Sequence, residues 1–90
     1  MAKAEISWRR ITEEGLRLQV YVQHVGPTWL FFAREKRFDQ WQAVLEPPLE
    51  DWLKLLDAVR RRINRRLLRP EEEARVETMI REKFPDAEID

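Results

Sequence analysis

The chain has 90 residues, of which 43% are apolar and 38% are charged, and its 17 Lys and Arg balance its 17 Asp and Glu. This length suits a single small domain, residues 1–90, and two glycines with five prolines are too few for a disordered or low-complexity chain. Because cysteine is absent, disulfides, thiolate nucleophiles and cysteine zinc sites are excluded.

The first two predicted strands precede the Gly26-Pro27 turn. Residues 6–11 have the composition of a strand, and Glu13-Glu14-Gly15 has that of a turn. Residues 16–22 alternate strictly between apolar and polar side chains, which is typical of a half-buried antiparallel strand. Its apolar face holds Leu16, Leu18, Val20 and Val22, and its polar face holds Arg17, Gln19, Tyr21 and, just beyond, Gln23.

Two further strands precede the double proline Pro47-Pro48. Residues 29–34 are apolar on both faces for most of their length, and Glu35-Lys36-Arg37 form a charged hairpin tip. Residues 38–45 are the fourth predicted strand. We expect Trp41, Ala43 and Leu45 to face the core, with Phe38, Gln40, Gln42 and Val44 on the opposite face.

After the prolines, apolar residues recur every three or four positions, which predicts helices. One long helix is expected over residues 48–68 and a shorter one over residues 70–84, with acidic residues in the first turn of each. The predicted fold is therefore α+β: a curved four-stranded antiparallel sheet (residues 5–46), the long amphipathic helix packed on one face, and the second helix. The apolar stripe expected on the long helix is Leu49, Trp52, Leu53, Leu56, Val59, Ile63 and Leu67.

Residue types that carry chemistry are sparse. His24 is the only histidine, so no paired-imidazole site can form, and we interpret it as a polar surface residue at a strand end. No hydroxyl residue has a base beside it in a recognisable motif, and no glycine-rich phosphate loop is present. The carboxylates cluster at helix starts, where the helix dipole accounts for them. We therefore expect no enzyme, no cofactor and no metal site.

The outer face of the sheet is the first candidate interface. Glu and Asp are missing from the central parts of the second to fourth strands, where Arg, Gln and aromatic side chains dominate. Such a surface suits single-stranded nucleic acid, because bases stack on flat rings and cations follow the backbone. An ordinary exposed face, or a face covered by the second helix or a second subunit, explains the pattern equally well. The candidate residues are Arg9, Arg17, Gln19, Tyr21, Gln23, Phe32, Arg34, Gln40 and Gln42.

A run of arginines is the second candidate. Six arginines fall within residues 60–69, and all but Arg60 lie opposite the apolar stripe of the helix. They form either a solvated helix end that matches the helix dipole, with glutamates 71–73 as ion-pair partners, or a surface that contacts phosphates. This secondary basic patch comprises Arg61, Arg62, Arg65, Arg66 and Arg69.

Charge is also distributed unevenly along the chain. Residues 1–69 hold 14 basic and 9 acidic residues, whereas residues 70–90 hold 3 basic and 8 acidic residues. A basic body suits a polyanionic partner, and the acidic tail can equally fold back and neutralise it. The longest apolar run, residues 29–33, is too short to span a bilayer, and charged residues interrupt any N-terminal signal segment. We expect a soluble cytoplasmic protein without a membrane partner.

The order of elements resembles that of the PUR domain (purine-rich-element binding) and, more loosely, the Whirly and coactivator-type single-stranded DNA-binding modules. The similarity covers residues 5–68. It involves the alternating strand at residues 16–22, the aromatic strand at residues 29–33, and the segment Leu45-Glu46-Pro47-Pro48-Leu49-Glu50-Asp51-Trp52 that leads into the helix. The resemblance implies binding of single-stranded DNA or RNA on the sheet face, and dimerisation through sheets and helices.

Two functions therefore remain open at this point. The first is a non-enzymatic module that binds nucleic acid, preferring single-stranded DNA or RNA on the outer sheet face. The second is a protein-interaction or homodimerisation module with no role in nucleic-acid binding. In either case we expect a homodimer, because the third strand is apolar on both faces and a chain of 90 residues has few ways to cover both.

Overall fold

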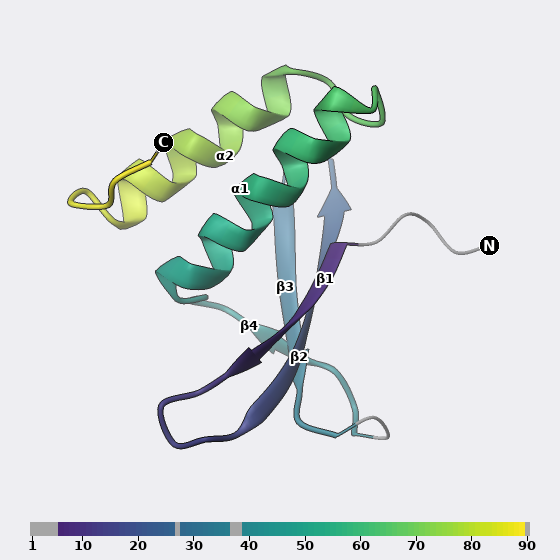
Figure 1. Cartoon of the computed structure of the whole chain (residues 1–90), viewed down its shortest axis with the longest axis vertical. Coiled ribbons are helices and arrows are strands. Elements are labelled where there is room, and N and C mark those ends of the chain that lie inside the picture. The colour runs from purple at the N-terminus through teal and green to yellow at the C-terminus, as the bar shows by residue number, and fades with distance from the viewer. Residues whose placement is uncertain (1–5, 27, 37–38, 90) are drawn as a thin grey trace. The chain divides into compact units, whose positions relative to one another are not determined.

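The computed structural model describes residues 6–26, 28–36 and 39–89, which form four strands followed by two helices (Figure 1). The fold class is α+β, as the sequence predicted. Contacts within the chain group it into two units, Met1–Glu46 and Pro47–Asp90. The first unit contains the sheet and the second contains both helices, and each unit is described by itself.

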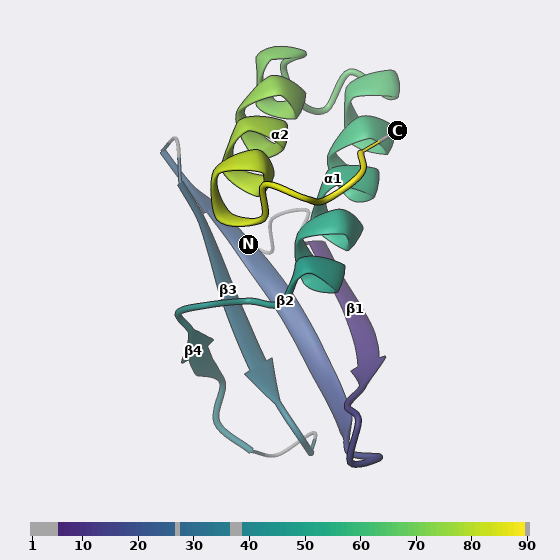
Figure 2. The same cartoon turned by 90° about the vertical axis from the view of Figure 1, so that its left-hand side faces the viewer.

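The sheet is antiparallel throughout, and its strands are neighbours in chain order (Figure 2). The turn after the first strand is closed by hydrogen bonds that Gly15 N and Leu16 N donate to Thr12 O and Thr12 Oγ1. Gly15 adopts φ 89°, a left-handed conformation that glycine takes at little cost. The strands are β1 (Ile6–Ile11), β2 (Arg17–Val25), β3 (Thr28–Arg34) and β4 (Gln42–Val44).

One face of the sheet carries its buried side chains. The register pairs Trp8 with Val20 and Val22 with Phe31, so these residues share a face, and the rings of Trp8 and Phe31 meet edge to face with centroids 6.4 Å apart. The alternation predicted for β2 is confirmed for Val20 and Val22, both of which are buried. The buried apolar residues of the sheet are Ile6, Val20, Val22, Trp29 and Phe31.

The prediction for the fourth strand is wrong in two respects. The strand begins at Gln42 rather than at residue 38; Phe38, like Pro27 and Arg37 of the predicted turns, lies outside the described residues. The two faces are also inverted. Gln42 lies opposite Ala33, on the buried side, whereas Ala43 lies opposite Phe32, on the outer side. Because side chains alternate with a period of two, an error of one residue in register moves every side chain to the other face.

The first helix, α1 (Leu49–Asn64), follows Pro48 and has Glu50 and Asp51 in its first turn, where carboxylates favour the positive end of the helix dipole. Its buried stripe lies slightly to one side of the predicted one, because Leu55 is fully buried whereas Leu53 and Ile63 are only half-buried. The buried apolar residues of α1 are Trp52, Leu55, Leu56 and Val59.

The end of α1 comes four residues before the predicted one. Leu67 N donates a hydrogen bond to Arg62 O (2.8 Å), and Arg66 N donates one to Ile63 O (2.9 Å). Together with the left-handed conformation of Arg66 (φ 61°), these bonds form a Schellman motif that stops the helix at Asn64. Glycine usually occupies this left-handed position, and the sequence therefore contains no conventional stop signal here.

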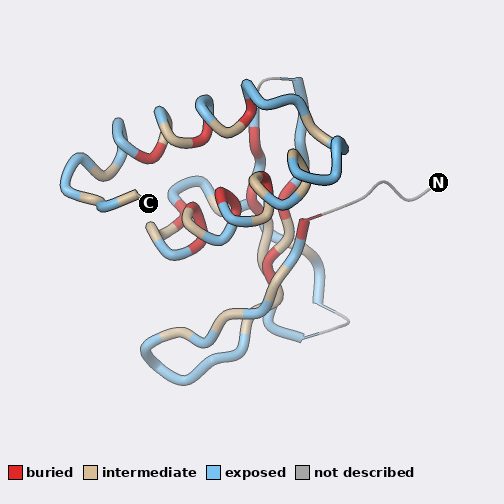
Figure 3. The backbone as a smooth tube through the Cα atoms, turned by 45° about the horizontal axis from the view of Figure 1, so that its top comes forward, coloured by how far each residue is buried: buried red, intermediate tan, exposed pale blue. Residues whose placement is uncertain are grey.

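The second helix, α2 (Glu71–Lys83), agrees with the sequence prediction to within one residue at each end. Its buried positions, Val76 and Ile80 among them, recur along one side of the helix (Figure 3). Arg60 of α1 links the two helices of this unit, since it donates hydrogen bonds to Glu73 Oε2 (2.8 Å) and Glu77 Oε2 (3.0 Å). Neither described helix is long and apolar enough to cross a membrane.

Candidate functional site

The outer face of the sheet is built by the residues that alternate with its buried set. Arg9 lies opposite Gln19, and Gln19 lies opposite Arg34, so three polar side chains form a row across β1, β2 and β3. In the next row, Tyr21 lies opposite Phe32. None of the residues in the four strands is Asp or Glu, whereas four are Arg, of which Arg9, Arg17 and Arg34 lie on the outer face. The potential of this face is therefore set by arginines that have no carboxylate on the strands beside them.

Three rings and one guanidinium of this face contact one another, and we call Tyr21, Phe32, Trp41 and Arg34 the aromatic–arginine cluster. The rings of Tyr21 and Phe32 are stacked, with centroids 5.0 Å apart and planes inclined by 18°. Tyr21 meets Trp41 edge to face at 4.7 Å. The Arg34 Cζ atom lies 4.2 Å from the centroid of a Trp41 ring, which is the geometry of a cation–π contact.

Arg34 is held in this place from three sides. Its Nε donates a hydrogen bond of 2.7 Å to Gln19 Oε1, and its Nη1 lies 3.5 Å from Asp39 O. Together with the contact to Trp41, these interactions fix a flat cation on an otherwise aromatic surface. A guanidinium plane and aromatic rings are both surfaces on which a nucleobase can stack.

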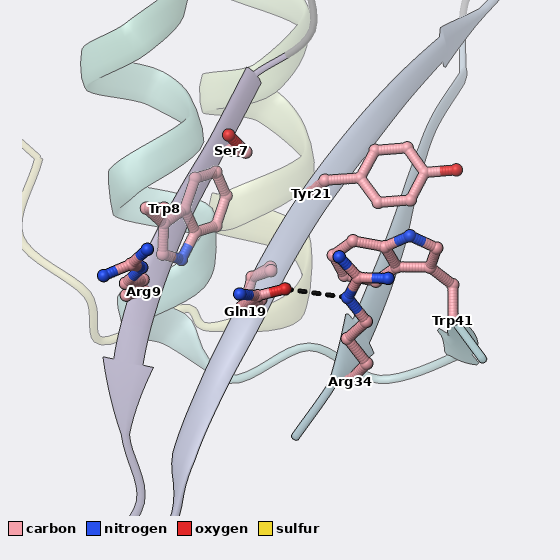
Figure 4. Close-up of a pocket in the computed structure, with 8 residues that line it drawn as sticks. Ser7, Trp8, Arg9, Gln19, Tyr21, Arg34 and Trp41 are labelled. Atoms are coloured by element: carbon pink, nitrogen blue, oxygen red, sulfur yellow. Dashed lines mark hydrogen bonds between the residues drawn. The ribbon is translucent and has the colours of Figure 1, made fainter. Parts of the chain in front are cut away.

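A hollow of about 560 Å³ lies beside the cluster, and the residues that line it come from β1, β2, β3 and the segment before β4 (Figure 4). Figure 4 shows the Gln19 amide between Arg9 and Arg34, with the Tyr21 and Trp41 rings at the other side of the hollow. Its lining consists of Ser7, Trp8, Arg9, Gln19, Val20, Tyr21, Arg34 and Trp41.

The remaining residues predicted for this interface lie away from the hollow. Arg17 is exposed at the start of β2, opposite Ile11, and Gln23 is exposed farther along β2, opposite Leu30. Gln42 does not join Tyr21 as predicted, because it lies opposite Ala33 on the buried side, and Gln40 lies before the start of β4. Both glutamines line a second hollow of about 570 Å³, and Arg34 belongs to the lining of both hollows.

Trp41 is the site residue that the sequence prediction missed. Its spacing from Ala43 and Leu45 suggested a core position, but it is only half-buried and contacts Tyr21 and Arg34 on the outer face. The pairing of Phe32 with Ala43 determines this placement, because Trp41 lies two residues before Ala43. Only the register between β3 and β4 could have revealed it.

The secondary basic patch at the end of α1 is mostly solvated. Arg61 forms an ion pair with Asp57 (3.0 Å) one turn earlier, whereas Arg65, Arg66 and Arg69 are exposed and lie beyond the helix. Arg60 differs from them, as predicted. The hydrogen bond to Glu73 is the main reason that the pKa of Arg60 is raised, the bond to Glu77 adds to it, and desolvation opposes both.

His24 is exposed, and its ring stacks on Trp29 with centroids 3.9 Å apart. Among the described residues, no group of three or more His, Asp and Glu side chains is arranged to hold a metal ion. Comparison of the chain with protein-family models, curated proteins and solved structures finds no match. The candidate site therefore has to be interpreted from its own geometry.

Proposed function

We propose that this protein binds single-stranded nucleic acid on the outer face of its sheet, without catalysing a reaction. The observation that supports the proposal best is the aromatic–arginine cluster, in which rings and a fixed guanidinium lie side by side on a surface whose strands contain no carboxylate. A duplex hides the faces of its bases within the stack, whereas a single strand can place them on this cluster.

The arginines of the outer face supply the second half of the argument. Arg9 is exposed on β1 in the same row as Arg34, and Arg17 is exposed on β2 in the neighbouring row. Cations placed in this way can follow a phosphate backbone while the bases reach the cluster. Each phosphate that is neutralised releases condensed counterions, so the affinity for a single strand falls as salt rises, with a logarithmic slope of about −0.7 per contact.

The test is a titration of fluorescently labelled oligonucleotides, single-stranded and duplex, at two salt concentrations. We expect tighter binding of the single strand and a steep loss of affinity at the higher salt concentration. Tyr21→Ala and Trp41→Ala should weaken binding with little change in salt slope, because base stacking releases no counterions. Arg9→Ala should weaken binding and reduce the slope by about 0.7.

The matched control is Arg81→Ala, which removes the same charge from an exposed position of α2. If it weakens binding as much as Arg9→Ala, the effect is one of net charge and the sheet face has no special role. If the triple change of Arg61, Arg62 and Arg65 to alanine abolishes binding while Tyr21→Ala has no effect, the basic patch is the contact surface. Absence of binding to every oligonucleotide at low salt would refute nucleic-acid binding altogether.

A second function is favoured by the apolar side chains of the same face. Ile11, Val25 and Leu30 are 65%, 53% and 40% exposed, and the register places all three on the outer side. Exposed apolar residues on one face are typical of a surface that meets another protein. The second candidate is therefore a protein-interaction module, and a second copy of this chain is the partner that sequence analysis anticipates.

Sedimentation at high micromolar concentration tests this second candidate. A homodimer that uses the outer face should dissociate when Leu30 is changed to Asp, because a charge in an apolar interface loses its hydration. Leu67→Asp is the matched control, since Leu67 is 58% exposed and belongs to the helical unit. A monomer at every concentration would exclude the homodimer, and equal dissociation by both variants would exclude the outer face as its interface.

A further inference from the structure

We infer that the hollow beside the aromatic–arginine cluster binds one nucleotide as a unit, with its phosphate at Arg9 and Gln19 and its base at Arg34 and Trp41. The inference rests on the proposed function and specifies the ligand of the same face. It follows from the kinds of hydrogen-bonding group that the hollow presents and from their positions.

The polar groups at one side of the hollow are predominantly donors. Gln19 Oε1 already accepts the bond from Arg34 Nε, and Gln19 Nε2 can donate to a ligand. Arg9 makes no hydrogen bond or ion pair with any described residue, and its guanidinium can only donate. A ligand that matches these groups must offer several acceptors and a negative charge, as a phosphate does.

The opposite side of the hollow is flat and aromatic. Tyr21 and Trp41 contribute their rings, and the guanidinium of Arg34 lies against Trp41. Adjacent strands are about 4.8 Å apart, so the row from Arg9 through Gln19 to Arg34 spans roughly 10 Å. A ligand with a phosphate at one end and a planar ring at the other fits this arrangement, and a nucleotide combines the two.

The role of Gln19 in this arrangement is to position Arg34. Its single amide accepts from the stacking cation and presents a donor toward the phosphate side, so it connects the two halves of the hollow. Gln19→Glu should keep the bond to Arg34 but place an acceptor and a negative charge where the phosphate is expected. It should therefore weaken binding of phosphorylated ligands much more than binding of nucleosides.

Calorimetric titration with four small ligands tests the inference directly: uridine 5′-monophosphate, uridine, ribose 5-phosphate and inorganic phosphate. The nucleotide should bind most tightly. Loss of the base should weaken binding by about 5- to 150-fold, which is the range that base–aromatic stacking provides. Loss of the phosphate should weaken it by about tenfold or more, because hydrogen bonds between ionised partners are lost.

Variants test which residues bind the phosphate and which bind the base. Arg9→Ala should reduce the affinity for the nucleotide toward that for uridine and leave the affinity for uridine unchanged. Trp41→Ala should weaken the binding of uridine and of the nucleotide but not that of ribose 5-phosphate. Trp41→Leu, checked by circular dichroism, replaces the alanine variant if that variant unfolds. Arg81→Ala is the matched control, since Arg81 is an exposed arginine of α2 that is absent from the lining of the hollow.

The outcomes separate this inference from the proposed function. If single-stranded oligonucleotides bind but the nucleotide binds no better than ribose 5-phosphate or uridine, the inference is overturned and the proposed function stands. If the nucleotide binds and no oligonucleotide does, strand binding is refuted and the hollow is a site for free nucleotides. If neither the oligonucleotides nor the four small ligands bind, the proposed function and the inference are both refuted. Competition between the nucleotide and a bound oligonucleotide is the result expected when both are correct.

Discussion

Replacement of Arg66 by glycine should leave the protein more stable than the same replacement of its neighbour Arg65. Arg66 has φ 61° and closes the Schellman motif that ends α1. A side chain with a Cβ atom costs roughly 1–2 kcal/mol in this left-handed region, whereas glycine adopts it without that cost. The same substitution one residue earlier, Arg65→Gly, gives no such relief, because Arg65 has φ −92°.

The magnitude follows from comparing the two variants. Each loses one exposed positive charge near the helix C-terminus, a change of about 0.3–1 kcal/mol, and each gains a flexible residue that costs about 0.4–1 kcal/mol through the unfolded state. These terms are similar at neighbouring positions and cancel in the difference. What remains is the left-handed strain at residue 66. The free energy of unfolding of Arg66→Gly should therefore exceed that of Arg65→Gly by roughly 1–2 kcal/mol.

Chemical denaturation of the two variants beside the original protein measures this difference from the transition midpoints, provided that the slopes agree. Thermal unfolding should show the same order, since about 1 kcal/mol corresponds to roughly 4–8 °C in a domain of this size. Equal stability of the two variants, or a more stable Arg65→Gly, would show that the left-handed conformation at residue 66 carries no strain.

Two further predictions concern the helical unit. Leu55→Ala should lower the free energy of unfolding by about 2–5 kcal/mol, because Leu55 is fully buried. Lys54→Ala, at an exposed position, should change the denaturation midpoint little. Similar midpoints for the two variants would contradict the assigned buried face. Arg60→Ala should destabilise the protein, and the effect should shrink at high salt because its bonds to Glu73 and Glu77 are partly exposed. The pKa of Arg60 is raised above its ordinary value, so its contribution is fully present at neutral pH and is lost only as the pH rises through that raised value; a loss between pH 7 and pH 10 would contradict this assignment.

The candidate site was only partly accessible from the sequence. The alternation in β2 placed Gln19 and Tyr21 on the outer face, because a strand with one apolar and one polar set has an evident orientation. The neighbouring strand β3 is apolar on both sides, so its pattern could not decide whether Phe32 or Phe31 joins Tyr21. The register resolves this choice by pairing Tyr21 with Phe32.

The sequence by itself determined the element types, since the hydrophobic period changes at the double proline and prolines 47, 48 and 70 mark the helix starts. Tertiary structure decided the faces of β4 and the end of α1. Trp41 lies on the outer face because the β3–β4 pairing places Ala43 opposite Phe32, and this pairing depends on two segments meeting in space. The helix ends at Asn64 because Arg66 adopts a left-handed conformation, and an arginine in the sequence does not predict that conformation. Local periodicity distinguishes helix from strand. The register of two strands and the sign of φ at a single residue depend instead on contacts that only the folded chain makes.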